Sequence, residues 1–373
     1  MPTPLLRLFT ELCAIPSPSG SERPVADRVA AELRSLGLEP SEDGTGPAIG
    51  SDAGNLLARI PATDDGGGTP IFLCAHLDTV PPTGPIEPVV EDGVVRNSAG
   101  TILGADNKAA IVAMVEAARR LRDDRRPHAG VELLFTTKEE VGLIGAFAFD
   151  PTALAATVGY VYDMAAPIGE VILGAPTAFA LELRFHGRAA HSGMAPEEGR
   201  SAIAAAARAV ADFRLGRIDD ETTTNAGLIR GGSARNIVPE HCVVEAEVRS
   251  HDDGKAAELV QELLETAGFA ASLGGCTLET EVRETYRAYR FRTQDTAVRI
   301  ASHGLARAGY EPSFGLTGGA ADANAFNANG LQCVNLANGM AQIHTADEHI
   351  AVADLEGMVE VTLGLVEAAR GAA

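Results

Sequence analysis

The stretch IFLCAHLDTV, residues 71–80, carries both the main fold signal and the first functional signal of this sequence. Residues 71–75 form a short apolar run, which is typical of a buried strand. The run then ends in two polar residues, His76 and Asp78. Because side chains alternate along a strand, a strand continuing through both would project them from the same face. Either the strand runs out into solvent here, or its end carries a functional site.

Short apolar runs of this kind recur further along the chain. Residues 131–137 and 158–162 are also predicted strands, and residues 105–121 have the apolar spacing of a helix. Alternating strands and helices indicate an α/β fold with a mixed, mainly parallel sheet flanked by helices. From about residue 177 the pattern changes to a separate α+β unit. We therefore expect one domain made of residues 1–176 and 290–373, with a second domain, residues 177–289, inserted into it.

Composition narrows the class of protein and its partners. With 46% hydrophobic and 22% charged residues, the 373-residue chain is expected to be globular. Its formal net charge of -21 makes nucleic acid and anionic membranes poor partners. The acidic excess fits either a salt-adapted surface or carboxylates that bind divalent cations, and composition does not choose between them.

Three further features predict a cytoplasmic location. No apolar run approaches the roughly 20 residues needed to cross a bilayer. The N-terminal stretch lacks the basic start of a signal peptide. The five cysteines are scattered, with no C-x-x-C pair, which indicates free thiols in a reducing compartment.

Acidic residues follow the other predicted strands. Glu139 and Glu140 come directly after residues 131–137, and Asp163 follows residues 158–162. Asp106 begins the predicted helix, where a helix N-cap is the simpler interpretation. In an open α/β sheet, ligands bind beyond the carboxyl ends of the strands. We therefore expect these carboxylates and His76 to converge on one site.

Such a cluster of anions requires a compensating positive charge, because burying several carboxylates together is very costly. Lys108 and Lys138 are too few for that purpose. Two divalent metal ions would supply the charge, and mixed histidine and carboxylate ligands suit Zn²⁺, or else Co²⁺ or Mn²⁺. One of two histidines near the end of the chain, His344 or His349, would complete the ligand set.

Seven segments together carry a resemblance to a known family. In chain order they are HLDTV, GADNKAA, TKEEVGLIGA, YDMAAPIG, GRAAHSGMAPEEGRSAI, ARNIVPEH and GGAADANAFNANG…IHTADEHI. The sequence resembles the peptidase T group of the di-zinc metallopeptidases, which also include aminoacylases and glutamate carboxypeptidases. The similarity runs from about residue 5 to residue 365.

The resemblance implies a role for each residue of the cluster. Asp106 would bridge two metal ions, and a cis peptide bond would follow it, between Asp106 and Asn107. Asp78 would hold the His76 ring by a hydrogen bond. The first ion would be completed by His76 and Asp163, the second by Glu140 and His344, and Glu139 would be the general base.

The inserted domain resembles the lid and dimerisation module of the family, which implies a homodimer. His191 would stabilise the oxyanion in the active site of the partner subunit, and Asn236 and Arg249 would bind the terminal carboxylate of the substrate. Simpler interpretations remain for two of these residues. His191 fits a locally bonded loop histidine, and Arg249 fits a charge at a strand edge.

The activity implied is a metal-dependent aminopeptidase that removes the N-terminal residue from short peptides, tripeptides above all. Two alternatives stay open: an N-acyl amino acid amidohydrolase or dipeptidase, and a catalytically silent binding protein on the same fold. The intact set of expected ligands argues against the silent protein. Ala110, Ala165 and Ala166 depart from residues common in the family, which leaves the shape of the substrate pocket open.

Overall fold

The protein is described here by a computed structural model, which covers residues 3–63 and 67–371. The chain divides into two compact units. The first contains Met1–Leu173, Arg290–Leu316 and Ala321–Ala373, and the second contains Gly174–Tyr289 and Thr317–Ala320. The second unit is therefore built mainly from one continuous segment that interrupts the first.

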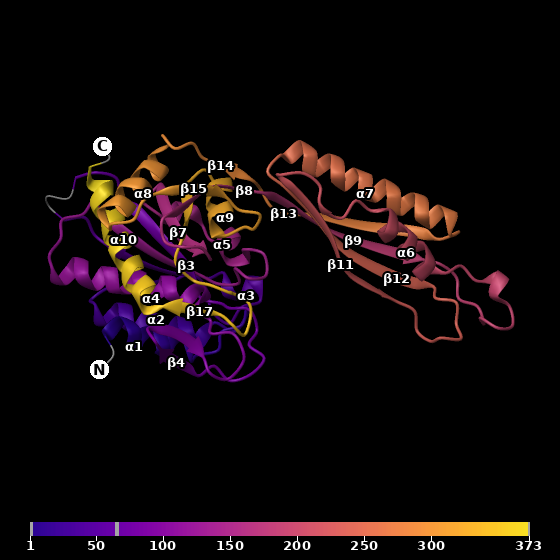
Figure 1. Ribbon diagram of the computed structural model, residues 1–373, viewed down its shortest axis with the longest axis horizontal. Helices are drawn as coiled ribbons and strands as arrows, with labels where there is room; N and C mark the ends of the chain where they lie inside the picture. The colour runs from indigo at the N-terminus through magenta and orange to yellow at the C-terminus, as the bar shows by residue number, and fades with distance from the viewer. Residues whose placement is uncertain (1–2, 64–66, 372–373) are drawn as a thin grey trace. The chain divides into compact units, whose positions relative to one another are not determined.

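The first unit is organised around a large sheet (Figure 1). Among the described residues this sheet has nine strands in the order β1-β2-β6-β3-β7-β16-β8-β14, with β15 paired to β8. The four central strands β6, β3, β7 and β16 are parallel, while β2 and β8 run antiparallel to their neighbours. The prediction of a mixed, mainly parallel sheet is thus confirmed. The strands are β1 Ser41–Glu42, β2 Leu56–Ile60, β3 Ile71–His76, β6 Val131–Thr136, β7 Val158–Met164, β8 Glu170–Ala175, β14 Tyr289–Arg290, β15 Ser313–Leu316 and β16 Gln332–Ala337.

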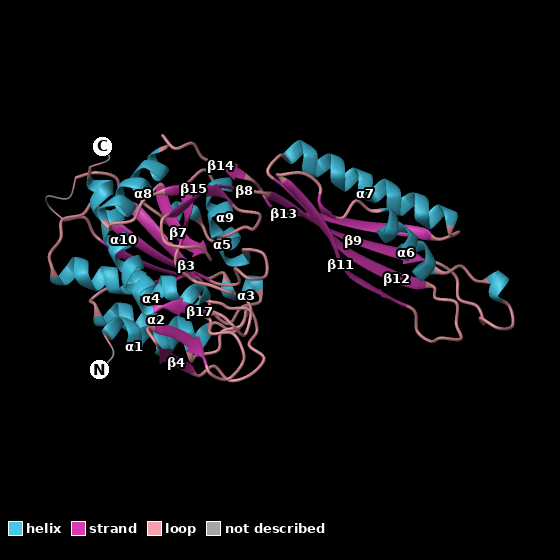
Figure 2. Ribbon diagram, viewed as in Figure 1, coloured by secondary structure: helices cyan, strands magenta, loops and turns pink. Residues whose placement is uncertain are grey.

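Helices and a small second sheet complete this unit (Figure 2). The small sheet pairs β17 (His349–Ala351), β5 (Val94–Asn97) and β4 (Pro88–Glu91). Within the described part of the chain, no helix is both long and apolar enough to cross a membrane. The helices are α1 Pro4–Cys13, α2 Arg23–Ser35, α3 Gly46–Ile49, α4 Ala105–Asp123, α5 Ile144–Ala148, η1 Pro151–Ala153, α8 Thr296–Arg307, α9 Asp322–Ala328 and α10 Val352–Arg370.

Strand β3 shows why both faces of the large sheet are covered. All six of its residues are buried, as expected of a central parallel strand. Ile71 and Leu73 belong to the same hydrophobic core as residues of α4 and α10. Phe72 points to the opposite face, where its ring lies 5.2 Å from that of Phe326 on α9. Gly159 on β7 makes room for Phe72, because a Cβ at this position would lie 2.1 Å from the ring.

The second unit is a single antiparallel sheet with helices on one face. Its strand order is β10-β11-β12-β9-β13 within the described residues. Leu181, Leu183 and Phe185 alternate along β9 and join a core with apolar residues of α6 and α7. The elements are β9 Thr177–His186, η2 Pro196–Glu198, α6 Ala202–Asp212, β10 Gly216–Arg217, β11 Thr222–Gly231, β12 His241–Ser250, α7 Asp253–Leu273 and β13 Thr277–Tyr286.

Candidate metal centre

The carboxyl ends of three adjacent parallel strands bring the expected residues together. His76 is the last residue of β3, and Asp163 lies near the end of β7. Glu139 and Glu140 follow the end of β6 at Thr136. Since β3 pairs in parallel with both β6 and β7, these ends lie at the same edge of the sheet.

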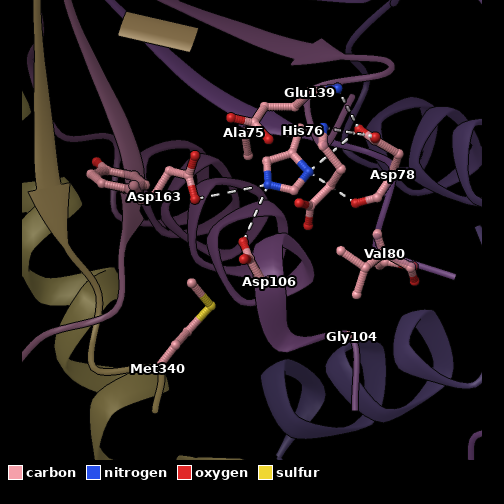
Figure 3. A network of polar contacts seen from close by, with 12 residues as sticks. Ala75, His76, Asp78, Val80, Gly104, Asp106, Glu139, Asp163 and Met340 are labelled. Atoms are coloured by element: carbon pink, nitrogen blue, oxygen red, sulfur yellow. Dashed lines mark hydrogen bonds and ion pairs between the residues drawn. The ribbon is translucent and has the colours of Figure 1, made fainter. Parts of the chain in front are cut away.

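His76 is oriented to bind a cation through Nε2. Its Nδ1 lies 2.9 Å from the main-chain oxygen of Asp78, an acceptor only, so Nδ1 carries the proton. The other ring nitrogen, Nε2, lies 3.2 Å from Oδ1 of Asp106 and 3.9 Å from Oδ1 of Asp163, as the dashed contacts in Figure 3 show. Only 1% of the His76 side chain is exposed, so water does not compete for this nitrogen.

A second histidine approaches Asp106 from the other side. Nε2 of His344 lies 3.2 Å from Oδ2 of Asp106 and 3.1 Å from Oε1 of Glu140. The two oxygens of Asp106 therefore face two different histidines. The other candidate from the sequence, His349, instead places Nδ1 2.7 Å from the main-chain oxygen of Asp347.

These separations fit two cations that share Asp106. Ligand atoms bound to one tetrahedral ion at about 2.0–2.1 Å lie roughly 3.3 Å from one another. The contacts of His76 and His344 with Asp106 have nearly this length. In addition, the candidate ligand atoms fall into two groups that share His76. Within each group the atoms lie within 4.8 Å of one another: His76, Asp106 and Glu140 in one, and His76, Glu139 and Asp163 in the other.

The protonation behaviour of the cluster indicates an excess of negative charge. Burial and the nearby charge of Asp106 raise the pKa of Asp163 to about 7. Burial and the charge of Asp163 raise the pKa of Glu139 well above its ordinary value. Hydrogen bonds to Asp106 and Glu140 raise the pKa of His344 to about 10. Without metal the cluster retains protons to offset its carboxylates, and divalent cations would replace those protons.

Asp78 contacts more than the histidine beside it. Strand β3 ends at His76, so the strict alternation of side chains does not extend to Asp78. Oδ1 of Asp78 lies 3.5 Å from Nδ1 of His76, further away than its own main-chain oxygen. The carboxylate mainly accepts hydrogen bonds from the main-chain N–H groups of Glu139 (2.9 Å) and Glu140 (3.2 Å) and from the hydroxyl of Ser19 (2.6 Å). It thus links the ends of β3 and β6.

Asp106 is not a helix N-cap. Gly104 caps α4, and Asp106 has non-helical dihedral angles of φ −78° and ψ 105°. The peptide bond between Asp106 and Asn107 is cis, as the resemblance implied. The carboxylate of the buried Glu348 accepts hydrogen bonds from the main-chain N–H groups of Leu103, Gly104 and Asp106. Sequence reasoning did not single out Glu348, although it follows His344 in the segment IHTADEHI.

Asp322 is a second buried carboxyl group that the sequence did not reveal. It is 1% exposed and lies at the start of α9. Oδ2 accepts a hydrogen bond from the hydroxyl of Thr136, the last residue of β6, and lies 3.8 Å from Sγ of Cys74 on β3. Among the described residues, Oδ1 has no hydrogen-bond partner. Burial raises the pKa of Asp322 to about 6.

The remaining candidates from the sequence lie in the second unit. Nδ1 of His191 accepts a hydrogen bond from the main-chain N–H of Gly193 at 3.2 Å. The segments that carry His191 and Asn236 are hydrogen-bonded to each other. The main-chain N–H of Ser192 donates to the main-chain oxygen of Asn236 at 3.0 Å. The guanidinium of Arg249 contacts Glu247 at 3.0 Å and the Gly318 oxygen at 3.3 Å.

Comparison with known proteins agrees with this arrangement. Residues 174–271 match the model of the peptidase dimerisation domain, and residues 55–213 match that of peptidase family M28. The chain is 37% identical to an aminopeptidase PepT from Bacillus cereus, with a TM-score of 0.88 and 98% of each chain covered. The chain belongs to the peptidase T group of metallopeptidases.

Two more relatives of this metallopeptidase extend over almost its whole length. A tripeptidase from Staphylococcus aureus is 32% identical, with a TM-score of 0.93 and 98% of each chain covered. The protein YqjE of Bacillus subtilis is 36% identical over 365 residues, again covering 98% of both chains. The peptidase T-like fold therefore includes both units and not the metal centre alone.

Proposed function

We propose that this metallopeptidase is an aminopeptidase that removes the N-terminal residue from short peptides, with tripeptides as its main substrates. The observation that carries the proposal is the shared carboxylate: Asp106 presents one oxygen to His76 and the other to His344. The similarity to the aminopeptidase from Bacillus cereus and the tripeptidase from Staphylococcus aureus supports the choice of substrate.

The residues at the strand ends would divide into ligands and a base. His76 and Asp163 would bind one ion, Glu140 and His344 the other, and Asp106 both. When bound, two divalent cations lower the pKa of water toward neutrality and polarise the carbonyl of the substrate. Zn²⁺ is our proposal for the ion, because histidine nitrogens and carboxylate oxygens together suit it.

Glu139 would transfer the proton. Its carboxylate is nearly buried and belongs to the same cluster as His76 and Asp163. The hydrogen bond from the main-chain N–H of Glu139 to the carboxylate of Asp78 fixes the backbone from which the Glu139 side chain projects. We infer that Glu139 accepts a proton from the attacking water and returns it to the nitrogen of the departing peptide, which is general acid–base catalysis.

Residues of the second unit would supply the remaining contacts to the transition state, with His191 acting on the active site of the partner subunit in the proposed dimer. Because Nδ1 of His191 accepts a hydrogen bond, the neutral ring carries its proton on Nε2, which can donate to a developing oxyanion. Asn236 and Arg249 would bind the terminal carboxylate of the substrate. An arginine can make two parallel hydrogen bonds to a carboxylate, for which Arg249 would exchange its contact with Glu247.

We also propose a cytoplasmic homodimer formed through the second unit. This unit matches the peptidase dimerisation domain. Within the described residues, β10 pairs only with Thr223 and Thr224 of β11, so the outer edge of β11 from Asn225 to Gly231 has no partner strand. An open strand edge is a template for pairing with another chain. Light scattering on the purified protein tests this proposal.

Hydrolysis of matched peptides tests the proposed activity. Tri-, di- and N-acetylated tripeptides are incubated with the metal-loaded enzyme, and the released amino acids are identified by mass spectrometry. We expect release of the N-terminal residue from tripeptides and little hydrolysis of acetylated ones. Equal turnover of acetylated and free peptides would contradict the aminopeptidase proposal.

A further inference from the structure

We propose that Glu348 is a positioning residue that fixes the bridging Asp106 relative to His344. This inference rests on the proposed function, because it concerns the geometry of the two-cation site. Oε2 of Glu348 accepts hydrogen bonds from the N–H groups of Leu103 (2.7 Å) and Gly104 (2.8 Å), and Oε1 accepts one from Asp106 (3.0 Å). Glu348 is only 2% exposed, so water cannot replace these bonds.

A carboxylate is well suited to this place in the fold. Leu103 and Gly104 precede α4 and Asp106 has non-helical dihedral angles, so the helix supplies no acceptor for their N–H groups. Hydrogen bonds from N–H groups to an ionised carboxylate are stronger than those to a neutral oxygen. Lys108, fully buried on the same helix, supplies positive charge nearby while its Nζ donates to the Ile15 oxygen at 2.7 Å. The opposite charges of Glu348 and Lys108 offset each other, which allows both side chains to be buried near the start of α4.

The position of Glu348 in the chain gives it a role beyond stabilising α4. It lies on the segment between β16 and β17 that also carries His344, and its own N–H donates to the Thr345 oxygen at 3.2 Å. One carboxylate thus holds the segment of His344 against the backbone of Asp106. In contrast, His76 and Asp163 project from strands β3 and β7, which are paired with each other within the large sheet. Loss of Glu348 should therefore weaken mainly the ion bound by Glu140 and His344.

The substitution Glu348→Gln tests this role, with Asp347→Asn as the matched control. Both substitutions remove one negative charge, and they do so at adjacent positions. Asp347 is exposed, whereas the amide group of a glutamine at 348 would face the N–H donors of Leu103, Gly104 and Asp106. Metal-free proteins are titrated with Zn²⁺ in a calorimeter. We expect the wild type and Asp347→Asn to bind two ions alike. In Glu348→Gln one ion should bind about 10–100-fold more weakly, the usual effect of losing an outer-shell partner of a metal ligand.

A second measurement does not depend on metal. In the metal-free protein, amide hydrogen exchange at Leu103, Gly104 and Asp106 should be faster in Glu348→Gln than in Asp347→Asn. Unchanged exchange, or two Zn²⁺ affinities equal to those of the wild type, would overturn the role of Glu348. If Glu348→Gln does not fold, as shown by its melting curve, Glu348→Asp is judged by the same criteria, because its shorter side chain cannot reach both Leu103 and Asp106. A wild type that binds fewer than two ions would contradict the proposed function and leave the exchange result to decide on Glu348.

Discussion

The carboxylate of Asp78 accepts a hydrogen bond from the main-chain N–H of Glu139 at a distance of 2.9 Å. The acidic residue that follows β3 thus holds the backbone of the proposed general base, which follows β6. The same carboxylate lies 3.5 Å from Nδ1 of His76. One side chain therefore connects the proposed ligand and the proposed base.

Substituting Asp78 by asparagine should lower kcat by about 10–100-fold, in line with other outer-shell partners of metal ligands. The amide group of asparagine would bring an N–H donor toward the N–H of Glu139 or Glu140, and their backbone would shift. Steady-state kinetics with a tripeptide measure the effect. Ser19→Ala is the matched control, since it removes only the hydroxyl bonded to Oδ2 and should have a smaller effect. Equal losses in the two variants would contradict this account.

Glu139→Gln should abolish most hydrolysis while both metal ions stay bound. An amide cannot accept the proton, and general base catalysis contributes about 10²–10⁴-fold to the rate. Measurement of kcat together with the metal content of the purified variant checks the prediction. In Glu140→Gln, by contrast, metal content should fall, because Glu140 contacts His344 within the proposed second site. A Glu139→Gln enzyme with wild-type kcat would eliminate Glu139 as the base.

His344→Ala should bind one ion less than the wild type and lose most of its activity. His349 provides a control within the same segment. Its ring is hydrogen-bonded to the main-chain oxygen of Asp347 and lies outside the cluster. His349→Ala should therefore keep both ions. Metal analysis after dialysis, joined to activity before and after a chelator, distinguishes the two variants. Full activity of the chelated wild type would argue against any metal-dependent mechanism.

Asp322 should make the stability of the metal-free protein depend on pH. Its folded pKa of about 6 exceeds the ordinary value of 3.8, so between these values the folded state binds more protons than the unfolded state. Stability from this group is fully present below pH 3.8 and is lost as pH rises through about 6. The change is on the order of 3 kcal/mol, since one pKa unit is worth about 1.4 kcal/mol.

Asp322→Asn should remove this dependence. The free energy of unfolding, measured by urea denaturation at several pH values, should shift in favour of the variant as pH rises from 4 to 7. Asp354→Asn is a useful comparison, because Asp354 is also an acidic residue in the first turn of a helix but is less deeply buried. If the free energy of unfolding changes with pH in the same way for the wild type and Asp322→Asn, the pKa of Asp322 is not raised by burial.

Local sequence patterns predicted the main elements well. The runs at residues 71–75, 131–137 and 158–162 correspond to β3, β6 and β7, and the predicted helix at 105–121 is α4. Such elements follow from short-range periodicity, because a strand or helix that packs in a core must bury a regular set of apolar side chains. The polar residues at the ends of these elements could be identified for the same reason, because they interrupt the apolar periodicity.

Contacts between distant segments could not be derived in this way. Residue type did not separate His344 from His349, and in the fold only His344 approaches Asp106. No local pattern singled out Glu348 or Asp322, although both are buried and hold other segments. Asp78 was expected to act on His76 through strand alternation, whereas its carboxylate is bonded mainly to the segment after β6.

By itself, then, the sequence determined the class of fold and the chemical types that meet at the strand ends, because both depend on periodicity and on where it breaks. Only the tertiary structure decided which oxygen of Asp106 faces which histidine and which buried carboxylates hold the backbone in place. Those relationships arise when parallel strands are aligned and loops fold back over their ends. The side chains that meet there come from segments far apart in the chain, and no local pattern records their distances.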